Sequence, residues 1–275
     1  MNAGEWFPAS PLYFDAMRLR DKSIIVTGST TGIGEAMARR FVAEGARVLV
    51  HGLERELGEK VVADLGPGKA ALHIDDLADP AAPGRILQAA LAAFGAVDAI
   101  VNNAAWIVRS SIETTDSALF DRCMAVNVRA PLLLVQAALP HLKRAHGCVL
   151  NIGSINGYCG EATQLAYSLS KGALITFSRN LADALGRDRV RVNHMNLGWV
   201  LSPNEYRLKV AEGLPKDWPD HPPAAFAPSG RILAPEQVAT AAVYWVGDES
   251  RPISGSVLEL DQYPIIGRNT VKEVE

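Results

Sequence analysis

The chain has 275 residues, of which 48% are hydrophobic and 21% are charged, and its formal net charge at pH 7 is −3. The hydrophobic share supports a buried core, and the lack of excess positive charge argues against nucleic acid as a main partner. No apolar run reaches the roughly 18 residues of a membrane span, no export signal pattern opens the chain, and no HExxH motif suggests a metal site. Three cysteines without CxxC spacing are typical of a reduced protein, so we expect a cytoplasmic location.

Short apolar segments alternate with segments of helical periodicity from residue 23 onward. Residues 1–20 precede them as an N-terminal extension, an arm expected to pack its aromatic residues on the body of the protein or on a neighbouring subunit. We expect helices from the turn at 28–34 to residue 44, at about 55–65, 81–94, 116–142 and 235–246, and a long one that ends near 185. The expected strands are 23–27, 47–50, 70–74, 99–102, 148–152, 191–195 and 256–260.

Strands that alternate with helices of this length predict a parallel sheet covered on both faces. The strands are apolar without alternation, which indicates burial on both sides. The sequence therefore predicts an α/β, doubly wound fold of about seven strands. No linker interrupts residues 21–275, so we expect a single domain, with a proline-rich, irregular insertion at 199–232.

A glycine-rich turn joins the first strand to the first helix. Residues 27–34 read TGSTTGIG, which places Gly28, Gly32 and Gly34 in the turn. Glycine permits the positive φ angles and the close backbone approach of a tight turn, and the N–H groups at the start of a helix favour a pyrophosphate. After the first strand of a βα series, this turn predicts dinucleotide binding.

A serine, a tyrosine and a lysine form a candidate proton-transfer set. Tyr167 and Lys171 share one face of the predicted helix, and Ser154 ends the preceding strand. A free phenol, with a pKa of about 10, is a poor acid or base at neutral pH. A lysine charge at ~4 Å is worth about 4 kcal/mol at an effective dielectric constant of ~20, so we expect Lys171 to lower the pKa of Tyr167 by roughly three units.

Asn127 lies inside the predicted helix 116–142, where asparagine is a mediocre helix former, and Pro131 follows four residues later. Because proline has no N–H, the Asn127 carbonyl loses its helical partner, and we expect the helix to bend there. That carbonyl then needs another donor, such as a water. An asparagine on an exposed helix face would explain the residue but not its pairing with Pro131.

Taken in order, these motifs resemble those of the short-chain dehydrogenase/reductase family, over about residues 21–261. The motifs are TGSTTGIG, Asp76 in DDLAD, NNAA at 102–105, Asn127, Ser154 and YSLSK at 167–171. The resemblance implies a Rossmann-type fold and an oxidoreductase that transfers a hydride between a nicotinamide and a secondary alcohol or carbonyl. It also implies that Tyr167 is the acid/base, that Ser154 orients the substrate oxygen, that Lys171 holds the ribose hydroxyls, and that Asn127 links Lys171 to solvent through a water.

The resemblance implies further contacts to the cofactor. Asp76 would accept a hydrogen bond from the adenine amino group, although Asp75 beside it leaves the choice between the two aspartates open. Ala105 replaces the glycine of the family's NNAG motif, which suggests a shifted loop. The expected cofactor-binding residues are Gly28, Thr30, Thr31, Gly32, Ile33, Gly34, Leu53, Asp76, Leu77, Asn103, Ala104, Tyr167, Lys171, Gly198, Val200 and Ser202.

The end of the second strand should select between NAD and NADP, because an acid there binds the ribose 2′-hydroxyl and an arginine accepts a 2′-phosphate. The run is VLVHGLER, with Gly52 where many NAD-using relatives are acidic and Leu53 at the next position. Leu53 offers a 2′-phosphate no charge, so we expect NAD rather than NADP. Arg55 would reverse this preference if it reached forward from the start of the helix.

The substrate is expected under residues 199–232, which would act as a lid. The tentative substrate residues are Ser154, Trp106, Asn156 and Trp199. Aromatic and amide side chains suit a sugar or polyol, whereas tryptophans that only pack beside the sheet are the alternative. The resemblance implies a homotetramer or homodimer. The alternative function is a catalytically silent nucleotide-binding regulator of the same fold, which would be expected to lack part of the catalytic set.

Overall fold

The structure, a computed structural model, describes residues 17–264. Its centre is a seven-stranded sheet in the order β3-β2-β1-β4-β5-β6-β7, and every pair of neighbouring strands is parallel. The predicted doubly wound sheet is thus confirmed, while the aromatic residues of the predicted arm lie outside the described residues. The strands are β1 (Ser23–Val26), β2 (Arg47–Gly52), β3 (Ala70–Ile74), β4 (Ala99–Asn102), β5 (Cys148–Ser154), β6 (Arg191–Leu197) and β7 (Val257–Leu260).

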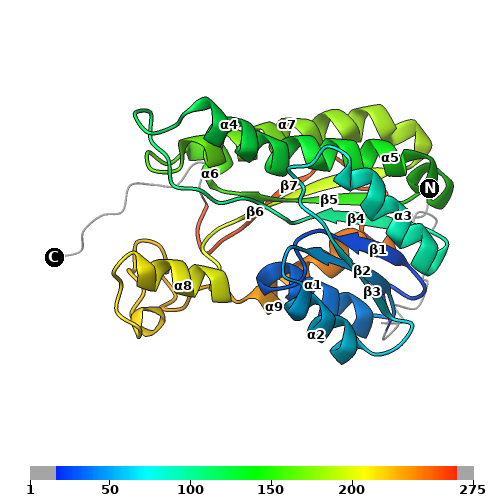
Figure 1. The fold of residues 1–275 in the computed structure, drawn as a ribbon, viewed down its shortest axis with the longest axis horizontal. Coiled ribbons are helices and arrows are strands. Elements are labelled where there is room, and N and C mark those ends of the chain that lie inside the picture. Colours follow the sequence, from blue (N-terminus) through cyan, green and yellow to red (C-terminus); the bar gives the residue numbers. More distant parts are fainter. Residues whose placement is uncertain (1–16, 265–275) are drawn as a thin grey trace, which may run out of the picture.

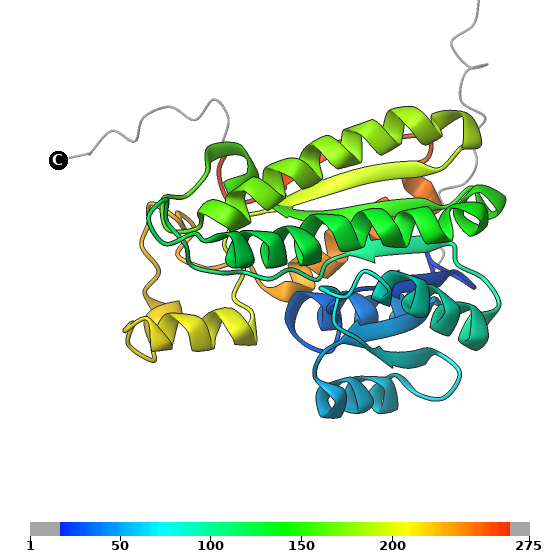
Figure 2. The same cartoon turned by 45° about the horizontal axis from the view of Figure 1, so that its top comes forward.

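Helices cover both faces of the sheet (Figure 1). One face carries α1 (Gly32–Ala43), α2 (Arg55–Leu65) and α9 (Pro235–Val246). The other carries α3 (Ala82–Phe94), α4 (Ser117–Met124), α5 (Ala130–Ala145) and α7 (Leu165–Leu185), and Figure 2 shows α5 and α7 running side by side over the strands. Two short helices, α6 (Asn156–Cys159) and α8 (Pro203–Ala211), lie in loops.

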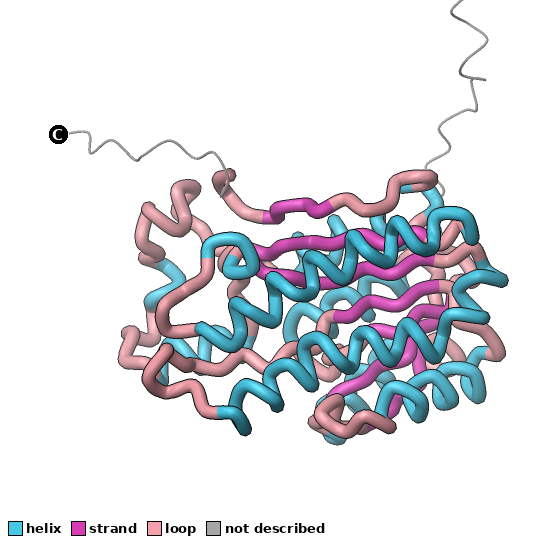
Figure 3. Tube along the Cα trace, turned by 90° about the horizontal axis from the view of Figure 1, so that it is seen from above, coloured by secondary structure: helices cyan, strands magenta, loops and turns pink. Residues whose placement is uncertain are grey.

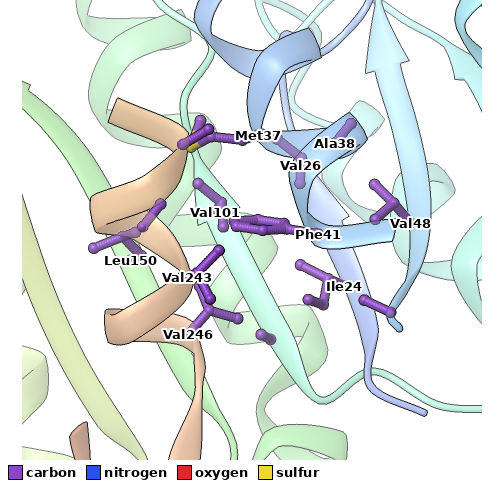
Figure 4. Close-up of a cluster of buried hydrophobic side chains, with 14 of the residues drawn as sticks. Ile24, Val26, Met37, Ala38, Phe41, Val48, Val101, Leu150, Val243 and Val246 are labelled. Atoms are coloured by element: carbon purple, nitrogen blue, oxygen red, sulfur yellow. The ribbon is translucent and has the colours of Figure 1, made fainter. Parts of the chain in front are cut away.

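Alternate residues of each strand supply the two cores, because successive strand side chains point to opposite faces. On one face, Ile24 packs with Phe41 of α1 and Val243 of α9 (Figure 4). On the other face, Ile25 packs with Ile86 of α3 and Leu134 of α5, among others. Both clusters are almost completely buried, so each helix layer is fixed to the sheet by apolar contact.

The strand order reverses between β1 and β4, which are hydrogen-bonded neighbours although β2 and β3 intervene in sequence. The chain leaves β1 towards one face and β4 towards the other, so a crevice opens beyond their carboxyl ends. In open α/β sheets, ligands bind at such a switch point. The fold therefore places the glycine-rich turn and the loop after β4 on the two sides of one crevice.

The predicted helix 116–142 consists of three consecutive parts. Between α4 and α5, residues Ala125–Arg129 form a π-helical turn, and the Ala130 N–H bonds to the Ala125 carbonyl. The whole segment Ser117–Ala145 is long and apolar enough to span a membrane by length and composition, but half of its most apolar window is buried in the fold. Figure 3 shows it lying along the sheet as one of the covering helices.

Residues 199–232 are more regular than predicted. They contain α8 and a 3₁₀ turn at Trp218–Asp220, and they project from the sheet in Figure 1. The segment has an aromatic core of its own, in which Trp199 stacks on Trp218 at 5.1 Å and Phe226 meets Trp199 edge-on. The sequence did not predict α8 because it buries no residue and so lacks an apolar stripe.

Candidate active site

The glycine-rich turn has the backbone shape that its sequence predicts. Gly28 and Gly32 have φ angles of 63° and 61°. A Cβ atom at Gly34 would lie 2.1 Å from the Gly28 carbonyl oxygen, and one at Gly28 would lie 2.8 Å from the Ala104 Cα. No side chain fits at these two positions, so the turn presents bare backbone beside the start of α1, where a phosphate would be stabilised.

A cavity of about 280 Å³ opens on this turn at the carboxyl ends of the strands. Trp106 was expected on the substrate side, but it lines this smaller cavity, with its ring 5.5 Å from the Arg122 guanidinium carbon. The loop after β4 turns Trp106 towards α4, and its role on the substrate side stays a prediction. The predicted cofactor-binding residues that line the cavity are Gly28, Thr30, Thr31, Gly32, Ile33, Gly34, Leu53, Asp76, Leu77, Asn103, Ala104 and Ser202.

The two adjacent aspartates at this cavity have different surroundings. Asp75 accepts hydrogen bonds from Arg85 at 2.7 Å and contacts His73 at 3.2 Å. The Arg85 guanidinium lowers the pKa of the Asp75 carboxyl to about 2. The Asp76 carboxylate accepts from the Ala78 N–H at 2.9 Å and contacts Arg122, a cavity residue, at 3.3 Å. Asp76 is therefore the aspartate with more acceptor capacity for a ligand.

Beyond the end of β2, the structure shows an acid that our sequence reasoning did not consider. Glu54 lines the smaller cavity, beside Gly52 and Leu53. Arg55, which could have reversed the expected preference for NAD, instead pairs with Glu59 at 3.8 Å and does not line the cavity. The signal was present in the sequence as an acidic residue two positions after Gly52.

A second cavity, of about 670 Å³, adjoins the first, and Ile33, Asn103 and Ser202 line both. Its wall includes Ser154 at the end of β5 and Tyr167 and Lys171 on α7. It also includes Asn156, Gly198, Trp199 and Val200. The fold thus brings the predicted proton-transfer set to a space large enough for a substrate, next to the glycine-rich turn.

Tyr167 and Lys171 are both buried, with exposed fractions of 7% and 3%. The Lys171 Nζ donates to the Ile152 carbonyl at 2.8 Å and lies 5.5 Å from the centre of the Tyr167 ring. Burial raises the pKa of Tyr167 to about 12, against a hydrogen bond from the Ser154 side chain that lowers it. Burial also lowers the pKa of Lys171 to about 8. The pKa of Tyr167 is therefore raised and not lowered as expected, because burial of the phenol is the largest effect on it.

Asn127 is buried in the π-helical turn and ties three elements together. Its Nδ2 donates to the Ser170 Oγ on α7 at 2.9 Å, and Ser170 in turn donates to the Tyr167 carbonyl. Its Oδ1 accepts from the Trp106 N–H at 2.7 Å. The pairing with Pro131 that drew attention in the sequence coincides with a change of helix type, since the turn at Ala125–Arg129 is π-helical. The Asn127 side chain holds α7 against the loop after β4.

A chain of hydrogen-bonded, buried polar side chains, which was not predicted from the sequence, links β4, β5, α7 and β6. Asn102 donates to Asn151 at 2.7 Å, and Asn151 donates to Ser178 at 2.8 Å. Ser178 contacts the His194 Nδ1 at 2.9 Å, and the His194 Nε2 lies 2.8 Å from the Asn196 Oδ1. Burial lowers the pKa of His194 to about 4, so its ring is neutral at pH 7.

Polar groups gather on the wall of the larger cavity next to the loop after β5. The Asn156 side-chain amide donates to Glu161 at 3.0 Å and to Gln164 at 3.1 Å. Arg109 joins this wall to the lid, because it donates to Glu161 and, at 2.8 Å, to Glu212 just after α8. The lid therefore closes the cavity through a charged contact.

Trp199, at the start of the lid, lines the same cavity. Its indole N–H donates to the Glu205 Oε1 at 2.8 Å, and its ring is stacked on Trp218. Ser202, expected to bind the cofactor amide, accepts from the Glu205 N–H as the N-cap of α8 while lining both cavities. The structure thus places Trp199 at the cavity and not merely beside the sheet.

Comparison with known proteins identifies what this arrangement is similar to. A family model described as short chain dehydrogenase matches residues 22–212. The chain is 32% identical over 246 residues to meso-2,3-butanediol dehydrogenase of Serratia marcescens, covering 89% of this chain and 95% of that protein. It is also 32% identical to the NADP-dependent (R)-specific alcohol dehydrogenase of Lentilactobacillus kefiri, over 249 residues, with 89% and 96% covered. The crystal structure of 3-ketoacyl-(acyl-carrier-protein) reductase from Brucella melitensis, complexed with NADH, superposes with a TM-score of 0.77 at 28% identity, covering 88% of this chain and 98% of that one.

Proposed function

Because the chain belongs to the short-chain dehydrogenase/reductase family, we propose that it transfers a hydride between NAD or NADP and a secondary alcohol or its ketone, with Tyr167 as the acid/base. The observation that carries the proposal is the convergence of Ser154, Tyr167 and Lys171 on a cavity of about 670 Å³ that adjoins the glycine-rich turn. Named dehydrogenases and reductases among the relatives and a structural neighbour with bound NADH support it.

The smaller cavity fits a dinucleotide on two observations. The backbone at Gly28 and Gly34 is too close to its neighbours for any Cβ atom, so no side chain at these two positions blocks the approach of a pyrophosphate to the turn. Asp76 and Leu77 line the other end of the cavity, where a base would lie between a hydrogen-bond acceptor and an apolar side chain. When bound, the nicotinamide supplies the hydride chemistry and, in its oxidised form, a positive charge.

The protein's own side chains supply or remove the proton of the substrate oxygen. With a pKa of about 12, the Tyr167 phenol is protonated at pH 7 and is poised to donate to a developing alkoxide during carbonyl reduction. Ser154, at the end of β5, places its hydroxyl within reach of the same oxygen and of Tyr167. Lys171 holds its charge 5.5 Å from the centre of the Tyr167 ring, with its Nζ anchored on the Ile152 carbonyl. In the direction of alcohol oxidation, Tyr167 must first lose its proton, so the rate of oxidation rises with pH.

A sugar or polyol is the substrate class that we propose within this reaction. Asn156, Glu161 and Gln164 offer amide and carboxylate groups on one wall of the cavity, which suit several hydroxyl groups. Trp199 offers an aromatic face to the same cavity. A screen of polyols, sugars, simple secondary alcohols, hydroxy acids and steroids, followed by absorbance of the reduced nicotinamide, tests this class.

We further propose that residues 21–275 act as one cofactor-binding and catalytic unit, in the cytoplasm, with Asn127 relaying protons from Lys171 through a water. Free Cys123, Cys148 and Cys159 support the location. A homotetramer or homodimer built through α5 and α7 would cover Leu132 and Leu169, which are 42% and 52% exposed. Light scattering coupled to gel filtration measures the subunit number directly.

Tyr167→Phe is the decisive variant for the proposed reaction. It removes only the hydroxyl, so we expect it to bind the dinucleotide as the wild type does and to lose nearly all turnover. Tyr158→Phe, on the short helix α6 outside both cavity linings, is the matched control and should keep its activity. Full turnover in Tyr167→Phe would overturn the assignment.

A further inference from the structure

Asn156, two residues after Ser154, is bonded to the catalytic serine and to the wall of the larger cavity. Its backbone N–H donates to the Ser154 Oγ at 3.2 Å. Its side-chain Nδ2 donates to the Glu161 Oε2 at 3.0 Å and to the Gln164 Oε1 at 3.1 Å. The main chain of Asn156 therefore fixes the distance between its side chain and the serine, while both hydrogens of its Nδ2 are used within the protein.

The orientations of the two amides follow from the chemistry of Glu161. A carboxylate paired with Arg109, as Glu161 is at 3.2 Å, can only accept hydrogen bonds, so the Asn156 atom that faces it is the nitrogen. That nitrogen also donates to Gln164, so the Gln164 atom that faces it is the carbonyl oxygen. The Asn156 Oδ1 is left as an acceptor and the Gln164 Nε2 as a donor.

Both of these remaining atoms are available to a ligand. Neither the Asn156 Oδ1 nor the Gln164 Nε2 bonds to a described residue, and both are open to solvent. Both side chains line the larger cavity. Gln164 is only 9% exposed, and although it is the N-cap residue of α7, its side chain makes no capping bond to that helix. The cavity wall thus presents a fixed acceptor and a fixed donor on two adjoining side chains.

The amide pair lies beside the groups that would hold the reacting oxygen. Asn156 is bonded to Ser154 through its N–H, and Gln164 precedes Tyr167 by three residues, which puts the two side chains on one side of the start of α7. A ligand oxygen that gives a hydrogen to one amide and accepts one from the other must be a hydroxyl, because a carbonyl oxygen can only accept. The pair is therefore matched to a hydroxyl group next to the reacting centre.

We propose that Asn156 and Gln164 select substrates that carry a second hydroxyl on the carbon next to the reacting one, which are vicinal diols and the corresponding α-hydroxy ketones. This hydroxyl donates to the Asn156 Oδ1 and accepts from the Gln164 Nε2. A substrate without it displaces water from both amides and leaves them unpaired. The inference rests on the proposed function, because it assumes reaction at Ser154 and Tyr167, and it adds the hydroxyl that the site recognises and the two atoms that bind it.

Initial rates of oxidation with three cyclic alcohols test the inference, because the alcohols share one carbon skeleton. Cyclohexanol has a single hydroxyl, cyclohexane-1,2-diol has two on neighbouring carbons, and cyclohexane-1,4-diol has two that are far apart. Gln164→Met keeps the length of the side chain and removes its donor, whereas Asn156→Ala removes the acceptor and keeps the N–H that bonds to Ser154. Gln88→Met, exposed on α3 outside both cavities, is the matched control.

Unpaired polar groups in a site built for a hydroxyl cost enough for a difference of roughly 10- to 100-fold. We therefore expect the kcat/KM of the wild type for the 1,2-diol to exceed that for cyclohexanol and for the 1,4-diol at least tenfold. In Gln164→Met and in Asn156→Ala this ratio should fall close to one, mainly through a higher KM for the 1,2-diol, because the bonds form on binding and persist in the transition state. Gln88→Met should keep the wild-type ratio.

Two kinds of failure are distinguishable. A wild type that oxidises all three alcohols with equal kcat/KM, or variants at Asn156 and Gln164 that keep the wild-type ratio, would overturn the inference and leave the proposed reaction standing. A wild type that oxidises no alcohol with either nicotinamide cofactor would overturn the proposed function itself.

Discussion

The buried ammonium of Lys171 should cost the protein stability that can be measured as a function of pH. Its pKa falls from the model-compound value of 10.5 to about 8 on burial, which at about 1.4 kcal/mol per pH unit corresponds to about 3 kcal/mol. Below pH 8 the lysine is protonated in the folded and the unfolded chain, and the folded state bears the whole cost. Between pH 8 and 10.5 the unfolded chain binds the proton that the folded chain has released, so stability rises with pH.

Lys171→Met isolates this cost, because methionine keeps much of the volume and carries no charge. The variant also loses the bond to the Ile152 carbonyl, but that loss does not vary with pH. We therefore expect the free energy of unfolding of the variant, relative to wild type, to fall by about 2 to 3 kcal/mol between pH 7 and pH 10. Urea unfolding followed by circular dichroism at several pH values gives this difference.

Lys60→Met, which removes an exposed lysine from α2, is the control, and its difference from wild type should stay constant over the same range. Because groups shared by both proteins cancel, alkaline effects elsewhere do not enter the comparison. A difference between Lys171→Met and wild type that is independent of pH would refute the reasoning that burial depresses the lysine pKa.

Three further outcomes follow from the geometry of the site. Gly153→Ala places a Cβ atom 2.0 Å from the His194 Nε2, so it should lower the free energy of unfolding by about 1 to 3 kcal/mol. Gly84→Ala, in open space on α3, should raise it by up to about 1 kcal/mol. Thermal unfolding of both variants measures the two changes. Arg109→Ala removes the ion pairs between lid and cavity wall, so KM for the substrate should rise severalfold with little change in dinucleotide affinity, and an unchanged KM would contradict this role. Asn127→Ala leaves the buried Trp106 N–H without its acceptor, so the free energy of unfolding should drop by about 3 kcal/mol, while Asn180→Ala, exposed on α7, should be neutral in the same assay.

Regular elements could be predicted closely because their signals are local. The helix at 55–65 and the strand at 99–102 have the predicted ends, since an apolar period and its flanking turn residues lie within a few positions. Helix α8 could not be predicted in this way, because it presents no buried face and therefore no apolar period. The order of the motifs along the chain was enough to identify the family, whose model matches residues 22–212.

The electrostatics of the site could not be predicted from spacing alone. Tyr167 and Lys171 do lie one helical turn apart, but the direction of the tyrosine pKa depends on how deeply both groups are buried. Gly52, at the end of β2, has no room for an acidic side chain, because Thr30 fills that space. Thr30 is a neighbour of Gly52 in space and not in sequence. Burial sets the direction of the tyrosine pKa and steric exclusion sets the residue at position 52. Both are properties of the assembled fold.

The lid is attached to the rest of the molecule through a narrow neck. A β-bridge joins Val200 to Leu233, and the Leu201 N–H donates to the Leu233 carbonyl at 2.8 Å. With its two ends joined in this way and Trp199 stacked on Trp218, the lid is held together by contacts of its own. Beyond the neck, the ion pairs of Arg109 and the hydrogen bonds of Gln262 with Ser229 and Arg231 hold the lid to the rest of the molecule, so we expect its opening to depend on ionic strength.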